Sequence, residues 1–362
     1  MTPYRIWQAR RCGYTLVEML IVVSIMIVLV AVTLPVAKKV MDGSQGREAS
    51  RQLNAYFAMA KARALQTGRP CGVYFPFQVP LGHTDPSLTA AQIPQYWPVR
   101  AVTQIYLAET PQHYSGSTTN ARGRVTGGNF VTCDLSGNND SNEAGYLGSL
   151  LNNKEQFLVR FNFKGDWYIC TNAGNNVFTY VRPLQGVVQP PSTASTFQIL
   201  RSPRPIGNAL DLPQGTCIDI TYSGVGNSAR QFPLPPTLNS IAAGVYVMFS
   251  PNGSVDAMYI NSLPTDPPVG SLYFLIGKIE KVGGNDPWDI TNSNFKSSIY
   301  PNKDISNLAD PTSLWVVVSR STGQVMTAEN MPDPTKVNGT DIRPYLLACR
   351  QAAIYGEQMT GR

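Results

Sequence analysis

The stretch that decides the fold is Tyr14–Ala37, which reads YTLVEMLIVVSIMIVLVAVTLPVA. It carries one charge, the carboxylate of Glu18. A helix of this length spans about 36 Å at about 1.5 Å per residue, which is enough to cross a hydrocarbon core of about 30 Å. From Met19 onward, only Ser24, Thr33 and Pro35 interrupt the apolar run. The stretch therefore predicts a membrane-spanning helix.

Two ordinary explanations account for only part of this stretch. A secretory signal peptide has an apolar region of about 7–15 residues followed by a small-x-small site. Here the run is longer, and its end, Pro35-Val36-Ala37, has proline where a small residue belongs. A signal anchor explains the apolar run but gives no use to Glu18, because a carboxylate at mid-bilayer costs about 2.5–3.5 kcal/mol.

The six residues 13–18, GYTLVE, follow a short basic leader and precede the apolar helix. This arrangement resembles the processing site of type IV pilins and of the pseudopilins of type II secretion. The resemblance implies that a prepilin peptidase cuts between Gly13 and Tyr14 and then methylates the new amine of Tyr14. It also implies a helix break at Pro35. Two residues depart from the usual pattern of this family. Tyr14 stands where the family usually has Phe or Met, and Cys12 stands where it often has a basic residue.

Glu18 becomes the fifth residue of the mature chain, where the family has its glutamate. The resemblance implies that Glu18 pairs with the N-terminal amine of a neighbouring subunit during assembly with other pilins or pseudopilins. A carboxylate in the first turns suits the positive end of the helix dipole, and such a pair offsets the desolvation of both charges. The alternative is that Glu18 neutralises the amine of its own chain or lies at the membrane interface.

The charges that flank the apolar run predict the topology. Three arginines precede it, and cytoplasmic segments carry the excess of Lys and Arg. We therefore expect a single-pass protein of the bacterial inner membrane, with the leader in the cytoplasm and the remainder extracytoplasmic. Removal of residues 1–13 lowers the formal charge from +6 to +3, which argues against a charge-driven partner such as DNA. The flanking basic residues are Arg5, Arg10, Arg11, Lys38 and Lys39.

The sequence divides into a leader (1–13), a transmembrane segment (14–37), an amphipathic helical continuation (38–67) and a head (68–362). In the continuation, Leu53, Tyr56, Phe57, Ala60 and Ala64 share one helical face, and Gly68 with Pro70 ends the helix. Charged residues are only 14%, while Gly (30) and Pro (28) are abundant, which favours short strands joined by turns. The expected fold class is α+β, with a long N-terminal helix packed on a β-rich, pilin-like head that carries large loop insertions.

Runs rich in β-branched and aromatic residues and bounded by Gly, Pro, Asn or Ser predict the strands of the head. They are 71–77, 100–108, 156–163, 167–171, 177–182, 196–201, 216–222, 244–250, 254–260, 271–279, 314–319 and 324–327. The segments 115–149, rich in Gly, Asn and Ser, and 183–236, rich in Pro, are expected to be surface loops.

Three stretches of the head sharpen the resemblance. They are residues 58–75, 245–255, with the turn FSPNGS, and 314–328, with the turn SRSTG. These stretches look like parts of the H-type minor pseudopilins and of their FimT-like pilin relatives. The region 78–243 has no counterpart in that family and is expected to be inserted into the head.

Few residues offer chemistry. Asp134–Glu143 crowds six Asn, Asp and Glu residues into one loop, which predicts turns and, as a second interpretation, a Ca²⁺ site. Five cysteines remain after processing, and an extracytoplasmic head permits two disulfides of undetermined pairing. They are Cys71, Cys133, Cys170, Cys217 and Cys349.

The sequence contains none of the common hydrolase, zinc-protease, nucleotide or dinucleotide motifs, and its two histidines, His83 and His113, lie in predicted loops without a partner motif. We therefore expect a structural subunit without enzymatic activity or cofactor, whose partners are the prepilin peptidase, other pilins, the inner membrane and secreted cargo. The alternatives are a FimT-like pilin of DNA uptake, or a membrane-anchored module that binds or hydrolyses carbohydrate.

Overall fold

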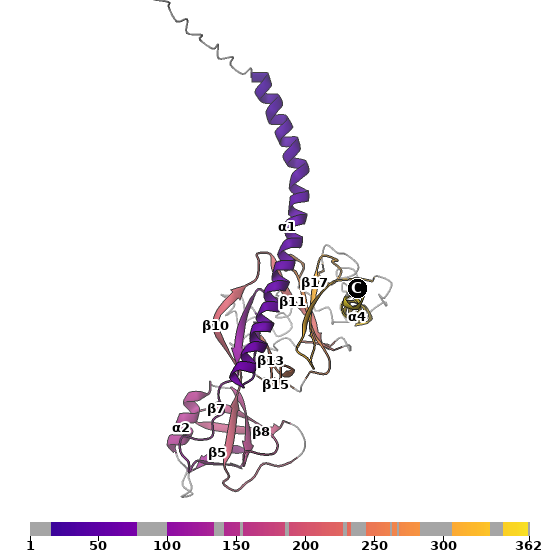
Figure 1. The fold of residues 1–362 in the computed structure, drawn as a ribbon. Helices are drawn as coiled ribbons and strands as arrows, with labels where there is room; N and C mark the ends of the chain where they lie inside the picture. Colours follow the sequence, from indigo (N-terminus) through magenta and orange to yellow (C-terminus); the bar gives the residue numbers. More distant parts are fainter. Residues whose placement is uncertain are drawn as a thin grey trace, which may run out of the picture. The chain divides into compact units, whose positions relative to one another are not determined.

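The computed structural model describes residues 16–77, 100–133, 141–152, 155–184, 188–226, 230–232, 244–260, 263–265, 268–282, 306–333 and 343–360. Within these ranges, the side chains of residues 32–42, 133, 141–142, 230–231, 263–264 and 356–360 are not described. The chain divides into two compact units, Met1–Gln45 and Gly46–Arg362. The helix α1, Leu16–Thr67, contributes residues to both units (Figure 1).

In the second unit, α1 buries the predicted face. Leu53, Phe57, Ala60 and Ala64 have no exposed surface, and Tyr56 is partly buried against the same core, as predicted for this helical face. The helix ends as expected, because Gly68 adopts a φ of 65° and its N–H donates to the carbonyl of Ala64 at 3.1 Å.

The first sheet has six antiparallel strands in the order β10-β3-β1-β13-β14-β15. Side chains alternate between its faces, as in any strand. On β1, Val73 and Phe75 join the core under α1, while Tyr74 faces the other way and stacks on Tyr246 with ring centroids 4.1 Å apart. The strands are β1 (Cys71–Pro76), β3 (Gln104–Glu109), β10 (Arg204–Asp211), β13 (Gly244–Phe249), β14 (Val255–Ile260) and β15 (Leu263–Thr265).

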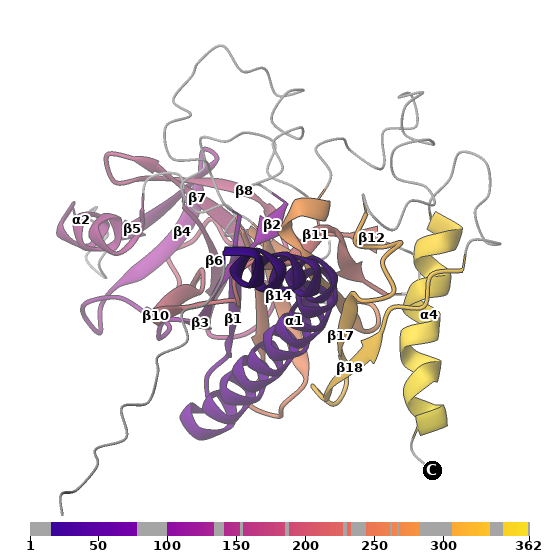
Figure 2. The ribbon, with the colours of Figure 1, turned by 90° about the horizontal axis from the view of Figure 1, so that it is seen from above.

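The second sheet runs β12-β11-β16-β17-β18, with β2 paired to β11, and it is covered on both faces. Phe274 points to the core under α1, whereas Tyr273 and Trp315 point to a second core under the C-terminal helix α4, Arg343–Thr360. Figure 2 shows α1 and α4 on opposite sides of β17 and β18. The strands are β2 (Ala101–Val102), β11 (Thr216–Val225), β12 (Arg230–Gln231), β16 (Leu272–Lys278), β17 (Leu314–Val318) and β18 (Val325–Glu329), and the short helix η3 (Ile279–Lys281) follows β16.

A third sheet, β4-β5-β8-β7-β6-β9, closes on itself. Gly123 of β4 exchanges two backbone hydrogen bonds, of 2.8 and 3.0 Å, with Ser195, which lies just before β9. We call residues 110–203 the barrel. Its core is rich in phenylalanine and is capped by Leu147 and Leu151. The elements are β4 (Arg122–Thr126), β5 (Asn129–Cys133), α2 (Ser141–Leu150), β6 (Gln156–Phe161), β7 (Tyr168–Gly174), β8 (Val177–Pro183) and β9 (Phe197–Arg201).

Each predicted strand lies at an observed one, but the two predicted loop segments are wrong. Segment 115–149 contains β4, β5 and α2, and segment 183–236 contains β10 and β12 in addition to β9 and β11, which lie at predicted strands. The dipeptide Gly127-Gly128 is a sequence signal for the hairpin of β4 and β5, because these glycines adopt φ values of 61° and 82° in its two-residue turn. Few side chains of these strands are large and apolar, so the pattern was weak. Of the expected insertion 78–243, only residues 110–203 form a separate folded barrel, whereas β2, β3, β10, β11 and β12 belong to the two main sheets.

Candidate functional site

The best candidate for a functional site is the N-terminal part of α1. Gly13 and Tyr14, the predicted processing residues, lie outside the described residues. Glu18 lies in the first described turn of α1 and is exposed. A carboxylate in this position interacts favourably with the positive end of the helix dipole, typically by 0.3–1 kcal/mol at an exposed site. Glu18 therefore places a negative charge where the resemblance expects one.

Apart from Ser24, the side chains of residues 19–30 are apolar, and they are exposed around the whole helix. Five consecutive residues, Met19 to Val23, span more than one turn of about 3.6 residues and are each 50–63% exposed. Ser24, the one polar residue among residues 19–30, donates its hydroxyl to the carbonyl of Ile21 at 2.8 Å. A helix that is apolar on every side is normally buried in a protein core or in a membrane. This segment is therefore built to be covered by lipid or by other helices.

Among the described residues, no helix combines the length and the hydropathy that a membrane crossing requires. α1 continues through Pro35, whose side chain lies outside the described residues, and the predicted effect of this proline stays a prediction.

The rest of α1 is tied to the head by polar contacts that the sequence did not reveal. Arg63 and Arg69 both form ion pairs with Glu109 at the end of β3, the first at 3.0 Å. Lys61 donates to the carbonyl of Thr322 at 2.8 Å, and Asn54 donates to the hydroxyl of Thr327 at 2.9 Å. These contacts fix the helix against both main sheets.

The two turns singled out in the sequence meet beneath α1. The N–H of Val255 donates to the carbonyl of Arg320 at 2.8 Å, which joins the turn after β13 to the turn after β17. Gly253 and Gly323 adopt φ values of 86° and 59° at this contact. These motifs therefore serve the packing of the head.

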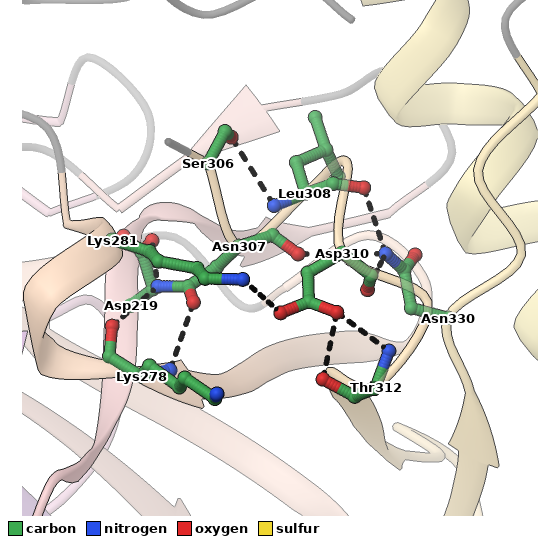
Figure 3. Close-up of polar contacts among 9 residues, drawn as sticks. All are labelled: Asp219, Lys278, Lys281, Ser306, Asn307, Leu308, Asp310, Thr312 and Asn330. Atoms are coloured by element: carbon green, nitrogen blue, oxygen red, sulfur yellow. Dashed lines mark hydrogen bonds and ion pairs between the residues drawn. The ribbon is translucent and has the colours of Figure 1, made fainter. Parts of the chain in front are cut away.

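A buried polar network fixes the segment 306–313 to the second sheet (Figure 3). Asn307 donates to Asp219 and to the carbonyl of Lys278, both at 3.0 Å, and accepts from the N–H of Lys278 at 2.8 Å. Asn330 donates to the carbonyls of Leu308 and Asp310 at 2.7 and 3.0 Å. Its amide oxygen accepts from the indole of Trp315. The network joins residues that are up to 111 positions apart (219 and 330).

Two carboxylates of this network have opposite pKa shifts. Burial raises the pKa of Asp219 to about 6, although hydrogen bonds from Asn307 and Thr221 oppose the shift. Burial would also raise the pKa of Asp310, but its hydrogen bonds from Lys281 and Thr312 bring it below the ordinary value. Because Asp219, Asn307 and Asp310 are buried and hydrogen-bonded within the head, we interpret the network as structural.

The structure describes only part of the acidic segment Asp134–Glu143 and one of the two histidines. Glu143 is buried in the barrel and accepts hydrogen bonds from Tyr114 and Ser117, while Asp134–Asp140 lies outside the described residues. Within the described part of the chain, no group of three or more His, Cys, Asp or Glu residues is arranged to hold a metal ion. His83 lies outside the described residues, and His113 stacks beside Trp167.

The expectation of two disulfides is not met by the cysteines whose side chains are described. Cys71, Cys170, Cys217 and Cys349 are free thiols. Each belongs to a different hydrophobic cluster, so none lies beside another. The side chain of Cys133 is not among those described.

Three arginines lie in the C-terminal part of the chain, Arg343, Arg350 and Arg362, and they bear on the alternative of DNA binding. Arg350 is fully buried in α4 and donates to the carbonyls of Tyr222 and Gly226 at 2.8 and 3.2 Å. Arg343 is exposed, and Arg362 lies outside the described residues. Arg350 therefore has a packing role.

Comparison with known proteins identifies the N-terminal segment. Residues 8–34 match the family described as the prokaryotic N-terminal methylation motif. This match indicates a pilin-like precursor that is processed by a prepilin peptidase, anchored in a membrane and assembled with other pilins. No curated protein and no solved structure matched the chain.

Proposed function

We propose that this protein is a minor pilin or pseudopilin, a structural subunit without enzymatic activity. The observation that carries the proposal is a coincidence of two features in one segment. Residues 8–34 match the methylation motif, and the described helix within them exposes apolar side chains on every side. Such a surface needs lipid while the subunit is stored in the membrane and needs neighbouring helices after assembly.

The processing steps follow from the motif. The prepilin peptidase cuts after Gly13 and methylates the amine of Tyr14, residues 14–37 cross the inner membrane, and the head lies on the extracytoplasmic side. Glu18 then pairs with the amine of a neighbouring subunit. This pair compensates both charges in a membrane, where an unpaired carboxylate costs up to about 2.5–3.5 kcal/mol at mid-bilayer and less near an interface.

The inserted barrel of the head favours a position at the tip of the filament. The stretches 58–75, 245–255 and 314–328 resemble the H-type minor pseudopilins, and residues 110–203 add a barrel to this head. A bulky inserted domain hinders repeated lateral packing, so we place the subunit at the tip of a type II secretion pseudopilus or a type IV pilus. Crosslinking that found it along the whole shaft would contradict this position.

The mature N-terminus and the effect of Glu18 test the proposal. Protein isolated from cells is expected to begin at methylated Tyr14, and Gly13→Leu is expected to leave the leader attached. Glu18→Ala is expected to be processed normally but to be lost from the filament. Ser24→Ala is the matched control, because the Ser24 hydroxyl bonds only within its own helix among the described contacts.

Two results would contradict the proposal. One is a chain that keeps Met1 in cells that contain an active prepilin peptidase. The other is normal secretion or piliation with Glu18→Ala together with hydrolytic activity of the fragment 46–362. The second result would favour the anchored hydrolytic module.

A further inference from the structure

The barrel is inserted at one point of the first sheet. β3 ends at Glu109, β10 begins at Arg204, and these two residues are directly paired. Residues 110–203 therefore form the connection of an antiparallel hairpin, for which two residues commonly suffice. The barrel also has a core of its own. The pairing of β3 with β10 does not need a connection of this size, so the barrel can serve a role separate from the fold of the first sheet.

One outer face of the barrel holds aromatic and cationic side chains in a fixed arrangement. The guanidinium of Arg160 lies over the ring of Trp167, 4.7 Å from its centroid. The Nε of Arg160 donates to Gln198 at 2.6 Å. The ring of His113 is stacked beside Trp167, with centroids 6.2 Å apart and planes at 17°. Arg160 is therefore oriented before any partner arrives.

The turn between β6 and β7 adds a strained apolar residue. Asn162 and Phe163 both have a φ of 54°, and Phe163 is 49% exposed. A bulky residue in the left-handed region costs of order 1–3 kcal/mol, and such strain is concentrated at functional sites. Here the strained backbone holds a phenyl ring in solvent.

The charges around these rings are mainly positive. Lys164 and Arg182 are exposed, and Arg182 is paired with Ile169, two residues after Trp167. Asp166 is the acidic residue of the same turn. Burial lowers the pKa of His113, and the neighbouring charge of Arg160 lowers that pKa further. We define the barrel patch as His113, Arg160, Phe163, Lys164, Trp167 and Arg182.

We propose that the barrel patch binds a carboxylate-bearing polypeptide surface of a partner protein. Trp and Arg are the residue types most enriched among residues that dominate binding energy. A guanidinium binds a carboxylate through two parallel hydrogen bonds, and its prior orientation by Trp167 and Gln198 reduces the entropy lost on binding. Phe163 supplies an apolar contact beside the charges. Single-stranded nucleic acid is a poorer fit, because it uses successive stacking rings along a basic groove.

Binding of a defined acidic probe tests the proposal. The full-length chain in detergent is titrated into a fluorescein-labelled random copolymer of glutamate and tyrosine, and anisotropy gives the Kd. Arg160→Gln and Trp167→Ala are each expected to weaken binding at least about tenfold. Arg51→Gln makes the same charge change on α1, where the side chain is 78% exposed, and is expected to change Kd less than about twofold.

Competing probes decide the chemical class. Oligothymidylate and polygalacturonate of equal charge are expected to bind at least about tenfold more weakly and to be insensitive to Trp167→Ala. The proposal is overturned if either binds as tightly as the copolymer through Trp167, if Arg51→Gln weakens binding as much as Arg160→Gln, or if the copolymer shows no saturable binding. If Trp167→Ala unfolds the barrel, the two variants Arg160→Gln and Arg160→Lys test the proposal instead. Both are then expected to bind the copolymer more weakly than the wild type. We expect leader cleavage and filament entry to stay normal in these variants. A failure of the binding proposal can therefore be distinguished from a failure of the proposed pilin function.

Discussion

Phe57 of α1 and Phe274 of β16 lie with their ring centroids 5.4 Å apart, although 217 positions separate them in the sequence. Phe57 also contacts Phe75 of β1 and Phe249 of β13, each at 6.0 Å. One side chain of the helix therefore packs on both main sheets at once, and it contributes to the attachment of the head to α1.

Replacement of Phe57 tests this attachment. Phe57→Ala is expected to lower the free energy of unfolding of the fragment 46–362 by about 3–5 kcal/mol, because it removes a fully buried ring and leaves a cavity. Met59→Ala is the control, since Met59 is 48% exposed on the same helix and should change the value by less than about 0.5 kcal/mol. Urea denaturation measures both, and equal effects would refute the role of Phe57.

The contact between the two turns predicts a strict requirement for glycine at position 323. A Cβ at Gly323 would lie 2.1 Å from the carbonyl oxygen of Gly253, and the φ of 59° adds strain. Gly323→Ala is therefore expected to destabilise the head by more than about 2 kcal/mol. Gly207→Ala also places alanine at a positive φ, of 73°, but in open space, and should cost only about 1 kcal/mol. Thermal unfolding that ranked the two variants in the opposite order would contradict the turn contact.

The raised pKa of Asp219 predicts how stability varies with pH. The folded state holds the proton up to about pH 6, whereas the unfolded chain releases it near 3.8. Between these values the folded state binds more protons, so the contribution of Asp219 to stability decreases as pH rises, by about 3 kcal/mol in total. Denaturation of the wild type and of Asp219→Asn at pH 4 and pH 7 isolates this contribution. A difference between the two proteins that is independent of pH would show that Asp219 has an ordinary pKa.

Excision of the barrel tests whether it is a separate insertion. We expect that replacing residues 110–203 by Asn-Gly leaves β3 and β10 paired, because Glu109 and Arg204 already face each other. The loss of the ion pair between Arg204 and Glu155, at 3.3 Å, should cost at most about 1 kcal/mol, because Arg204 is 42% exposed. A single cooperative thermal transition of the shortened chain is the expected result. Aggregation or a non-cooperative transition would show that the barrel supports the head.

Much of the head could be predicted because the relevant signals are local. The apolar face from Leu53 to Ala64 follows from helical spacing, and the end of α1 follows from Gly68. Runs such as 244–250 and 314–319 are rich enough in Val and Phe to predict strands. The turn at Gly127 and Gly128 was missed because its flanking strands carry arginine and threonine as often as apolar residues.

The sequence by itself determined the features of this protein that act along one stretch of chain. The glycine, the glutamate and the apolar run of residues 13–37 carry the resemblance to pilin precursors through their order and spacing, and residues 8–34 match the N-terminal methylation motif. Only the tertiary structure decided which distant residues meet. It closed the barrel through Gly123 and Ser195, placed Asn307 against Asp219, and brought His113, Arg160 and Trp167 together. The physical reason is that strand pairing joins segments across long loops, and no local pattern records the register of that pairing.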